Sequence, residues 1–269
     1  YAVFGNPVEH SKSPQIHRAF AVQTGEAIAY DKQPVAPDDF YRAADAFFAE
    51  GGKGLNITVP FKQEAYSYAA KLTVRARNAG AVNTLAMQNN GTVLGDNTDG
   101  IGMVRDMLEN LNWQIKGRRV LVLGAGGAVR GILEPLLEQL PQKVFFATRT
   151  LAKALQLAKG VAERGYLLGC DYEMLEGQQF DLIINGTSAS LSAQLPPLPD
   201  GLLAGQACCY DMMYAAQPTV FMIWAKQQGA TSITDGLGML VEQAAESFRL
   251  WRGISPNTAP VIAEIRQSL

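Results

Sequence analysis

The stretch Arg119–Gly131, RVLVLGAGGAVRG, decides the fold of this chain. The apolar, β-prone run VLVL at 120–123 predicts a buried parallel strand. The glycine-rich run GAGG follows at 124–127, and a helical pattern starts at Ala128. Such a turn binds phosphate, because glycine lets an anion approach the free N–H groups at the start of the helix. The turn departs from the G-x-G-x-x-G/A pattern, since Val129 stands where a third small residue is expected.

The residues after the next predicted strand indicate which dinucleotide this turn would bind. The strand Lys143–Ala147 (KVFFA) runs into Thr148-Arg149-Thr150, with Lys153 one turn further on. NAD-binding units carry an acidic residue at this position. The only acidic residue in 139–164 is Glu163, which lies too far along the following helix. Cationic side chains in this position suit a 2′-phosphate, so we expect NADP rather than NAD. The alternative is that Arg149 and Lys153 form a solvated helix start.

Composition excludes several classes of protein. With 269 residues, 48% of them hydrophobic, the chain is long enough for two modest domains. The net charge of -2 provides no basic surface for nucleic acid, so we expect no nucleic-acid partner. No apolar run is long enough to cross a membrane, so we expect no membrane partner. Three cysteines without C-x-x-C indicate reduced thiols and a cytoplasmic protein, and two histidines without H-E-x-x-H predict no metal site. We expect a monomer or a homodimer without a signal peptide, lacking a few leading residues because it begins at Tyr1.

The pattern of elements predicts two α/β domains. Residues 1–99 alternate short strands and helices and end in a hairpin around Asn89-Asn90-Gly91. Residues 100–236 alternate strand and helix, as in a Rossmann-type parallel sheet with helices on both faces. The C-terminal helices in 237–269 are expected to complete the first domain, which would bind the substrate. The predicted strands are 1–5, 28–33, 55–59, 82–87, 92–94, 119–123, 143–147, 166–168, 180–184, 207–211 and 231–234.

Two predicted helices carry clear apolar stripes. The helix that begins at Thr98-Asp99 places Val104, Met107, Leu108 and Leu111 on one face. The helix Leu237–Trp251 has six apolar residues on one face, which leaves Gln243 among its polar positions. The other predicted helices are 14–24, capped by Ser13, and 37–49, 61–70 and one from Ala128 that contains Pro135.

Eight short strings together span nearly the whole chain: GNPVEHSKSPQIH at 5–17, GLNITVPFK at 54–62, AGAVNT at 79–84, GDNTDG at 95–100, GAGGAVRG at 124–131, NGTS at 185–188, YDMMY at 210–214 and DGLGMLVEQ at 235–243. In this order they resemble the signatures of shikimate dehydrogenases. The resemblance implies NADPH-dependent reduction of 3-dehydroshikimate to shikimate, a step in aromatic amino acid (chorismate) biosynthesis. In the family, Asn-Arg-Thr often replaces 148–150, Arg often replaces Lys153, and Ala sometimes replaces Gly186.

Lys62 and Asp99 are the catalytic candidates. A ketone that accepts a hydride develops negative charge on its oxygen, which calls for a cation or a proton donor. We expect Lys62 to donate that proton and Asp99 to orient Lys62 and a substrate hydroxyl. The plainer alternatives are that Lys62 is a surface lysine in the first turn of a helix and that Asp99 is a carboxylate at a helix start, where the helix dipole favours it.

The resemblance implies the remaining site residues. Those expected to bind the substrate are Ser11 and Ser13 with Tyr214 at its carboxylate, and Asn56, Thr58, Asn83 and Gln243 at its hydroxyls or carboxylate. Those expected to bind the cofactor are Gly124, Gly126, Gly127, Ala128, Thr148, Arg149, Thr150, Lys153, Thr187, Met212, Gly236 and Met239. Plainer readings are a helix cap for Ser13, solvent exposure for Gln243, a helix start for Gly236 and a core position for Met239.

Two other functions stay open from the sequence. A quinate/shikimate dehydrogenase that uses NAD would be favoured by an acidic residue after the second nucleotide-binding strand, where Thr148 stands. A non-catalytic NADP-binding sensor with the same fold would be favoured by the loss of Lys62 or Asp99, and both are present.

Overall fold

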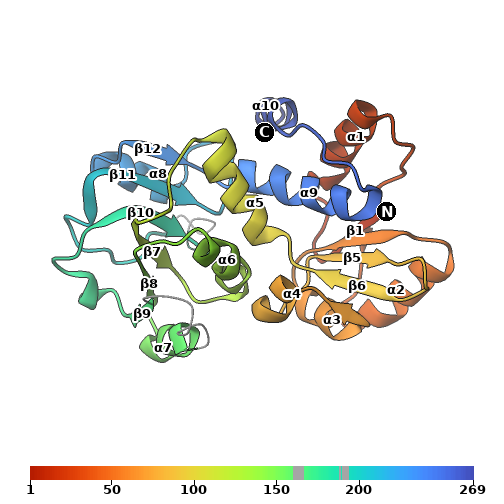
Figure 1. Cartoon of the computed structure of the whole chain (residues 1–269), viewed down its shortest axis with the longest axis horizontal. Helices are drawn as coiled ribbons and strands as arrows, with labels where there is room; N and C mark the ends of the chain where they lie inside the picture. Colours follow the sequence, from red (N-terminus) through yellow and green to blue (C-terminus); the bar gives the residue numbers. More distant parts are fainter. Residues whose placement is uncertain (160–166, 188, 190–193) are drawn as a thin grey trace. The chain divides into compact units, whose positions relative to one another are not determined.

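The protein divides into two compact units (Figure 1). The first contains Tyr1–Gly102 and Leu240–Ser268, and the second contains Met103–Met239 with the terminal Leu269. This is a computed structural model, and the residues that it describes are 1–159, 167–187, 189 and 194–269. No described helix is long and apolar enough to cross a membrane.

The first unit is built on a mixed six-stranded sheet. Its strands are β1 (Ala2–Gly5), β2 (Asp31–Pro34), β3 (Gly54–Ile57), β4 (Lys71–Leu72), β5 (Thr84–Met87) and β6 (Val93–Asp96). They lie in the order β2-β1-β3-β5-β6-β4. Strand β1 pairs in parallel with β2 and β3, whereas β5 is antiparallel to both β3 and β6. The antiparallel pair β5–β6 confirms the predicted hairpin.

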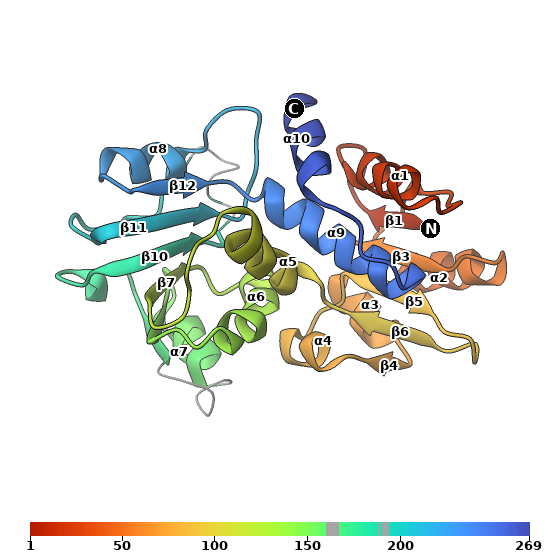
Figure 2. The same cartoon turned by 45° about the horizontal axis from the view of Figure 1, so that its top comes forward.

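Alternating side chains of β1 bury both faces of this sheet. Phe4 belongs to a buried cluster with Phe40 and Phe61, and Val3 packs on the other face with Tyr30 and Trp251. Helix α1 lies beside α10, as Figures 1 and 2 both show. The helices of this unit are α1 (Ser13–Thr24), α2 (Phe40–Ala49), α3 (Lys62–Tyr68), α4 (Val74–Ala79), most of α9 (Leu237–Arg252) and α10 (Ala259–Gln267).

The second unit is a doubly wound parallel sheet, as predicted. Its strands are β7 (Arg119–Leu123), β8 (Lys143–Ala147), β9 (Leu167–Cys170), β10 (Phe180–Asn185), β11 (Leu203–Asp211) and β12 (Ser232–Thr234). They are all parallel, in the order β12-β11-β10-β7-β8-β9. Val120 and Val122 join one buried cluster, and Leu121 and Leu123 join another on the opposite face. The order reverses between β7 and β10, where such sheets bind nucleotides.

The helices of the second unit cover this sheet. They are α6 (Gly127–Glu138), α7 (Leu151–Lys159) and α8 (Val220–Gln227), together with the 3₁₀ turn η3 (Glu173–Leu175). Pro135 lies inside α6 and is buried. Helix α5 (Asp99–Arg105) enters this unit from the first, and the π-helical segment η1 (Asp106–Asn110) continues it.

Several predicted elements differ from the structure. The second strand begins at Asp31 rather than Ile28, and β9 runs over Leu167–Cys170, while the predicted start at Tyr166 lies outside the described residues. Leu108 is 37% exposed, contrary to the predicted stripe, because the wider turn of η1 shifts the phase of the helix. Ser13 does not cap α1: it is the first helical residue, and Lys12 holds the cap position.

Helix α4 was not predicted, and α8 was expected only from the alternation of strand and helix, without bounds, although the caps of both are readable. Helix α4 begins after Thr73, whose hydroxyl accepts a hydrogen bond from the Ala76 N–H at 3.2 Å. Helix α8 begins after Thr219, whose hydroxyl accepts from the Met222 N–H at 3.2 Å. Threonine at the N-cap satisfies a backbone donor that the helix leaves free.

Candidate active site

The first unit brings Lys62 and Asp99 together. Lys62 is the first residue of α3 and Asp99 the first of α5, and Lys62 Nζ donates to Asp99 Oδ2 at 2.6 Å. The Lys62 side chain is 33% exposed and that of Asp99 13%. The ammonium is therefore reachable by a small molecule, yet it is anchored on a carboxylate. A solitary surface lysine would have no such partner, so this geometry favours a paired site.

Asn83 holds the other oxygen of Asp99. Its Nδ2 donates to Asp99 Oδ1 at 2.7 Å, and its Oδ1 accepts from the Thr98 backbone N–H at 2.9 Å. A carboxylate can only accept and a backbone N–H can only donate, so these contacts fix the orientation of the Asn83 amide. Asp99 is thus held on one side by an amide and on the other by an ammonium.

Gln243 belongs to the same cluster. It lies on α9, is 9% exposed, and has its Oε1 3.3 Å from Asn83 Nδ2. Its Nε2 donates to the Leu240 carbonyl at 2.8 Å. The solvent-exposed alternative for Gln243 was wrong, because α9 is buried on nearly all sides between Val241 and Phe248.

Ser11 and Ser13 form a second polar group in the same unit. The Ser11 hydroxyl donates to Ser13 Oγ at 3.1 Å, and the Ser13 N–H points at Ser11 Oγ at 3.3 Å. Both hydroxyls lie at the start of α1, where the first N–H groups of the helix favour an anion. Ser13 is 7% exposed and lies near the hydroxyl of Tyr30, a residue that was not predicted from the sequence.

Asn56 and Thr58 lie at the end of β3. Asn56 is buried, and its amide makes contacts on all sides within the protein. Thr58 is half-buried just beyond the strand, and its methyl group would lie 2.4 Å from a Cβ placed on Gly5. Glycine at position 5 is therefore required for Thr58 to sit where it does. Tyr214 belongs to the second unit, where burial and Asp235 raise the pKa of its hydroxyl.

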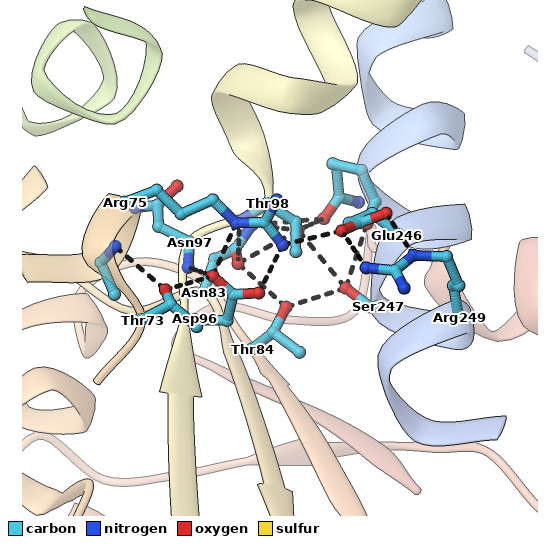
Figure 3. A network of polar contacts seen from close by, with 12 residues as sticks. Thr73, Arg75, Asn83, Thr84, Asp96, Asn97, Thr98, Glu246, Ser247 and Arg249 are labelled. Atoms are coloured by element: carbon cyan, nitrogen blue, oxygen red, sulfur yellow. Dashed lines mark hydrogen bonds and ion pairs between the residues drawn. The ribbon is translucent and has the colours of Figure 1, made fainter. Parts of the chain in front are cut away.

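A buried charged network supports this cluster (Figure 3). Arg75 of α4 donates to Asp96 at the end of β6 and, at 2.8 Å, to Glu246 of α9, and Arg249 also contacts Glu246. Asp96 and Glu246 side chains are each 1% exposed. Removing Arg75 would leave two buried carboxylates poorly compensated, so this network holds β6, α4 and α9 together.

The residues that connect the polar groups were not predicted from the sequence. Thr84 and Ser247 stand 2.8 Å apart through their hydroxyls, and Thr98 donates to Asn83 Oδ1 at 3.2 Å. Ser247 follows Gln243 by four residues, which places both on one face of α9. That spacing was a readable signal. No comparable signal marked His17 or Tyr30, whose neighbours come from distant parts of the chain.

In the second unit, the glycine-rich turn leaves open space. Gly124 follows β7 with φ +105°, a conformation that favours glycine, and Gly126 holds the N-cap position of α6. A Cβ built on Gly126 would meet no atom within 4 Å, and one on Gly127 would meet only the Arg130 guanidinium at 3.7 Å. The first N–H groups of α6, from Gly127 and Ala128, border that space. This cradle fits the pyrophosphate of a dinucleotide.

The structure explains why Val129 replaces the third small residue. A Cβ built on Gly186, just after β10, would lie 2.5 Å from Val129 Cγ2. The third glycine of such turns allows close packing of helix and strand, and here Gly186 provides that space from the opposite side. Thr187 follows, with its hydroxyl donating to Asn185 Oδ1 at 2.7 Å, and Ser188 lies outside the described residues.

Three further cofactor candidates meet at the same end of the sheet. A Cβ on Gly236 would lie 2.3 Å from the Met212 carbonyl, and the Gly236 N–H donates to the Met213 carbonyl at 3.1 Å. Met212 is 7% exposed and Met239 9%. Gly236 is therefore required for close packing of the chain after β12 on the chain after β11.

The polar residues after β8 lie at the surface. Thr148 is half-buried, and its N–H donates to the Cys170 carbonyl at 3.3 Å. Arg149, Thr150 and Lys153 are exposed. Two cations beside the end of β8 are accessible to a phosphate group, and this exposure suits a solvated helix start equally well.

Comparisons with known proteins point to one family along the whole chain. The model of the shikimate dehydrogenase substrate-binding domain matches residues 3–85. The model of shikimate / quinate 5-dehydrogenases matches residues 106–193, and that of the shikimate 5′-dehydrogenase C-terminal domain matches residues 236–266.

Individual relatives give the same result. A curated shikimate dehydrogenase (NADP(+)) of Cellvibrio japonicus is 62% identical, covering 100% of this chain and 97% of its own. The crystal structure of an Ael1 enzyme from Pseudomonas putida is 45% identical with a TM-score of 0.93, covering 98% of this chain and 97% of its own. The structure of shikimate 5-dehydrogenase from Thermus thermophilus with NADP(H) and shikimate is 30% identical with a TM-score of 0.88, covering 100% and 98%.

Proposed function

Because this chain belongs to the shikimate dehydrogenase family, we propose that it catalyses the reversible NADPH-dependent reduction of 3-dehydroshikimate to shikimate. The reaction is a step of aromatic amino acid (chorismate) biosynthesis. The observation that carries the chemistry is the Lys62–Asp99 pair, 2.6 Å apart and oriented by Asn83. The NAD-dependent quinate alternative is not favoured, because the relatives are named for NADP(+).

Lys62 is the proton donor in this proposal. Bound NADPH supplies the hydride that reduces the carbonyl carbon. Lys62 donates a proton to the carbonyl oxygen as negative charge develops there, and in the reverse direction it accepts the proton of the hydroxyl. Asp99 holds Lys62 through Oδ2, and Asn83 holds Asp99 through Oδ1, so the ammonium is oriented before the substrate arrives.

The other residues bind and orient the two ligands. Ser11 and Ser13 bind the substrate carboxylate with Tyr214, and Thr58, Asn83 and Gln243 contact the ring hydroxyls or the carboxylate. Asn56, also expected to bind the substrate, has its amide filled by contacts within the protein and would act through its neighbours. In the second unit, the turn of Gly124, Gly126, Gly127 and Ala128 would hold the pyrophosphate. Thr148, Arg149, Thr150 and Lys153 would hold the 2′-phosphate, and Thr187, Met212, Gly236 and Met239 would line the nicotinamide end.

A spectrophotometric assay tests the proposal. Purified protein is offered shikimate or quinate, each with NADP or with NAD, and nicotinamide reduction is followed. Fast turnover with shikimate and NADP, and at least tenfold slower turnover in the other three combinations, is the expected result. Equal rates with NAD would contradict the cofactor assignment. Binding of NADP without turnover of either acid would instead identify a non-catalytic sensor.

The cellular setting of this activity is also a proposal. All three cysteines, Cys170, Cys208 and Cys209, are free thiols, and burial raises the pKa of the Cys209 thiol to about 12. Unpaired, protected thiols suit a reducing compartment, so we place the enzyme in the cytoplasm. We expect a monomer or a homodimer, which light scattering after size-exclusion chromatography distinguishes.

A further inference from the structure

The amide of Asn56 lies at the centre of the polar network in the first unit. Its Nδ2 donates to Ser247 Oγ at 3.0 Å and to Thr84 Oγ1 at 3.2 Å. Its Oδ1 accepts from the Tyr30 hydroxyl at 2.7 Å and lies 3.1 Å from His17 Nε2. An asparagine amide has two N–H donors and two acceptor sites, so every hydrogen-bonding position of Asn56 is filled from within the protein.

The orientation of this amide follows from its neighbours. The Ser247 hydroxyl donates its single proton to the Gln243 backbone carbonyl at 3.0 Å, so its oxygen is left to accept from Asn56. The Asn83 carbonyl, which can only accept, lies 3.4 Å from Asn56 Nδ2. Nδ2 therefore faces β5 and α9, and Oδ1 faces His17 and Tyr30.

His17 must donate to Asn56 as a neutral ring. Its Nε2 faces the Asn56 oxygen, so the proton is on Nε2, while Nδ1 is buried and finds no hydrogen-bond partner among the described residues. The ring stacks on Tyr30 with centroids 4.4 Å apart and an interplanar angle of 12°. Complete burial lowers the pKa of His17 to about 3, so the ring stays neutral at ordinary pH.

Asn56 connects the two ends of the proposed substrate site. In one direction, the Tyr30 hydroxyl that donates to Asn56 lies near the Ser13 hydroxyl, and Ser13 accepts a hydrogen bond from Ser11. In the other direction, the Thr84 hydroxyl that accepts from Asn56 donates to Asn83 Oδ1 at 2.9 Å, and Asn83 holds Asp99. A rotation of the Asn56 amide would place Oδ1 against the Asn83 carbonyl, which can only accept. It would also require the Ser247 hydroxyl to release the Gln243 carbonyl and the His17 ring to move its proton to Nδ1.

We propose that His17 and Tyr30 are positioning residues for shikimate, which act by holding the Asn56 amide in the one orientation that joins the paired serines to the Lys62–Asp99 pair. This inference rests on the proposed function. Neither side chain touches the reacting atoms: both are buried, and the Tyr30 hydroxyl and His17 Nε2 face Asn56. Their loss should therefore weaken shikimate binding without weakening NADP binding, which belongs to the other unit.

Single variants test this effect. Tyr30→Phe keeps the ring and removes one donor, and His17→Leu removes the other donor. Each should raise KM for shikimate about tenfold, with KM for NADP unchanged within about twofold, since one hydrogen bond changes an equilibrium by about that factor. His17→Gln offers an amide N–H near the position of Nε2 and should restore most of the loss. Tyr68→Phe, which removes a tyrosine hydroxyl bonded to Asp45 outside the network, is the matched control and should leave both constants unchanged.

A double-mutant cycle tests whether Tyr30 acts through Asn56. If it does, adding Tyr30→Phe to Asn56→Ala should raise KM for shikimate no further. The inference would be overturned if the effects of Tyr30→Phe and Asn56→Ala on KM for shikimate were additive, or if Tyr30→Phe and His17→Leu left that KM unchanged. It would also be overturned if His17→Gln raised KM as much as His17→Leu does. In each of these cases, turnover of shikimate by the wild-type protein would leave the proposed function intact. A wild-type protein that neither binds nor oxidises shikimate would overturn both.

Discussion

The two units prepare their sites in opposite ways. In the first, side chains from β3, β5, α1, α3, α5 and α9 fill each other's hydrogen-bonding capacity, so that Lys62 and Asp99 are held before any ligand is present. In the second, the candidate site is an open space beside the glycine turn that no side chain fills: a Cβ on Gly126 would meet nothing within 4 Å. The first site is defined by side chains and the second by exposed backbone.

This difference predicts that the two sites respond differently to substitution. A hydrogen-bonded network fixes orientation, which matters most where a proton moves, and losing one member leaves a buried partner unsatisfied. A backbone cradle tolerates changes around it as long as its space stays empty. Substitutions in the first unit should therefore act on turnover and shikimate binding, and substitutions in the cradle on NADP binding.

The largest effect should come from removing the proton donor. Lys62→Ala is expected to lower kcat for shikimate oxidation by about 10²- to 10⁴-fold, because general acid–base groups contribute about that much. NADP affinity, measured by fluorescence titration, should stay the same. Lys53→Ala, at an exposed lysine of the same unit, is the matched control. A Lys62→Ala enzyme with wild-type kcat would remove Lys62 from the mechanism.

Acid should destabilise the protein through His17. Its pKa is lowered by burial to about 3, below the ordinary value of about 6.5, so its contribution to stability is full above pH ~6.5 and is lost as the pH falls towards 3. At pH ~4.5 the loss should be about 2–3 kcal/mol in the free energy of unfolding. Urea unfolding of wild type and His17→Gln across this range measures it. Parallel pH curves for the two proteins would show that His17 is not the source.

A smaller effect should separate packing from ligand binding in the second unit. Gly186→Ala places a methyl group 2.5 Å from Val129 Cγ2 and should lower the free energy of unfolding by about 2 kcal/mol, as overpacking does. Adding Val129→Ala should recover part of that loss. Gly205→Ala, where a Cβ meets nothing within 4 Å, is the control. If Gly186→Ala unfolds like wild type, the account of the missing third glycine fails.

The smallest effect concerns the choice of cofactor. Arg149→Ala should reduce the preference for NADP over NAD about tenfold, because an exposed cation contributes about 1–2 kcal/mol to phosphate binding. The ratio of kcat/KM for the two cofactors measures this preference. An unchanged ratio would leave Arg149 as a solvated helix start.

The same contrast explains what the sequence reveals. Strand β7, the glycine turn and α6 occupy one continuous stretch, so local pattern alone predicted the fold of the second unit and indicated the turn as a candidate phosphate cradle. Residues of the first site come from positions as far apart as Ser11 and Ser247, and only the resemblance to a family brought their candidates together. Neither source identified Tyr30 and His17, because their role depends on Asn56, a contact that forms only in the folded sheet.

Errors in local structure also have physical causes. The π-helical segment after α5 turned Leu108 outwards, and periodicity with a fixed helical step has no means to detect such a segment. Gln243 was expected to bind the substrate, and burial of α9 on nearly all sides excludes the alternative that it is exposed to solvent. Ser13 had the form of a helix cap, yet it is the first helical residue and its hydroxyl accepts a hydrogen bond from Ser11.

Crossed calorimetric titrations test the central claim that the two sites are built separately. Wild type, Asn83→Ala and Gly126→Val are each titrated with shikimate alone and with NADP alone. Asn83→Ala should weaken shikimate binding about tenfold or more and leave NADP binding unchanged, since it removes the amide that holds Asp99. Gly126→Val should fill the open cradle and do the reverse. If folded Asn83→Ala and Gly126→Val proteins each lost both ligands equally, the claim would be contradicted.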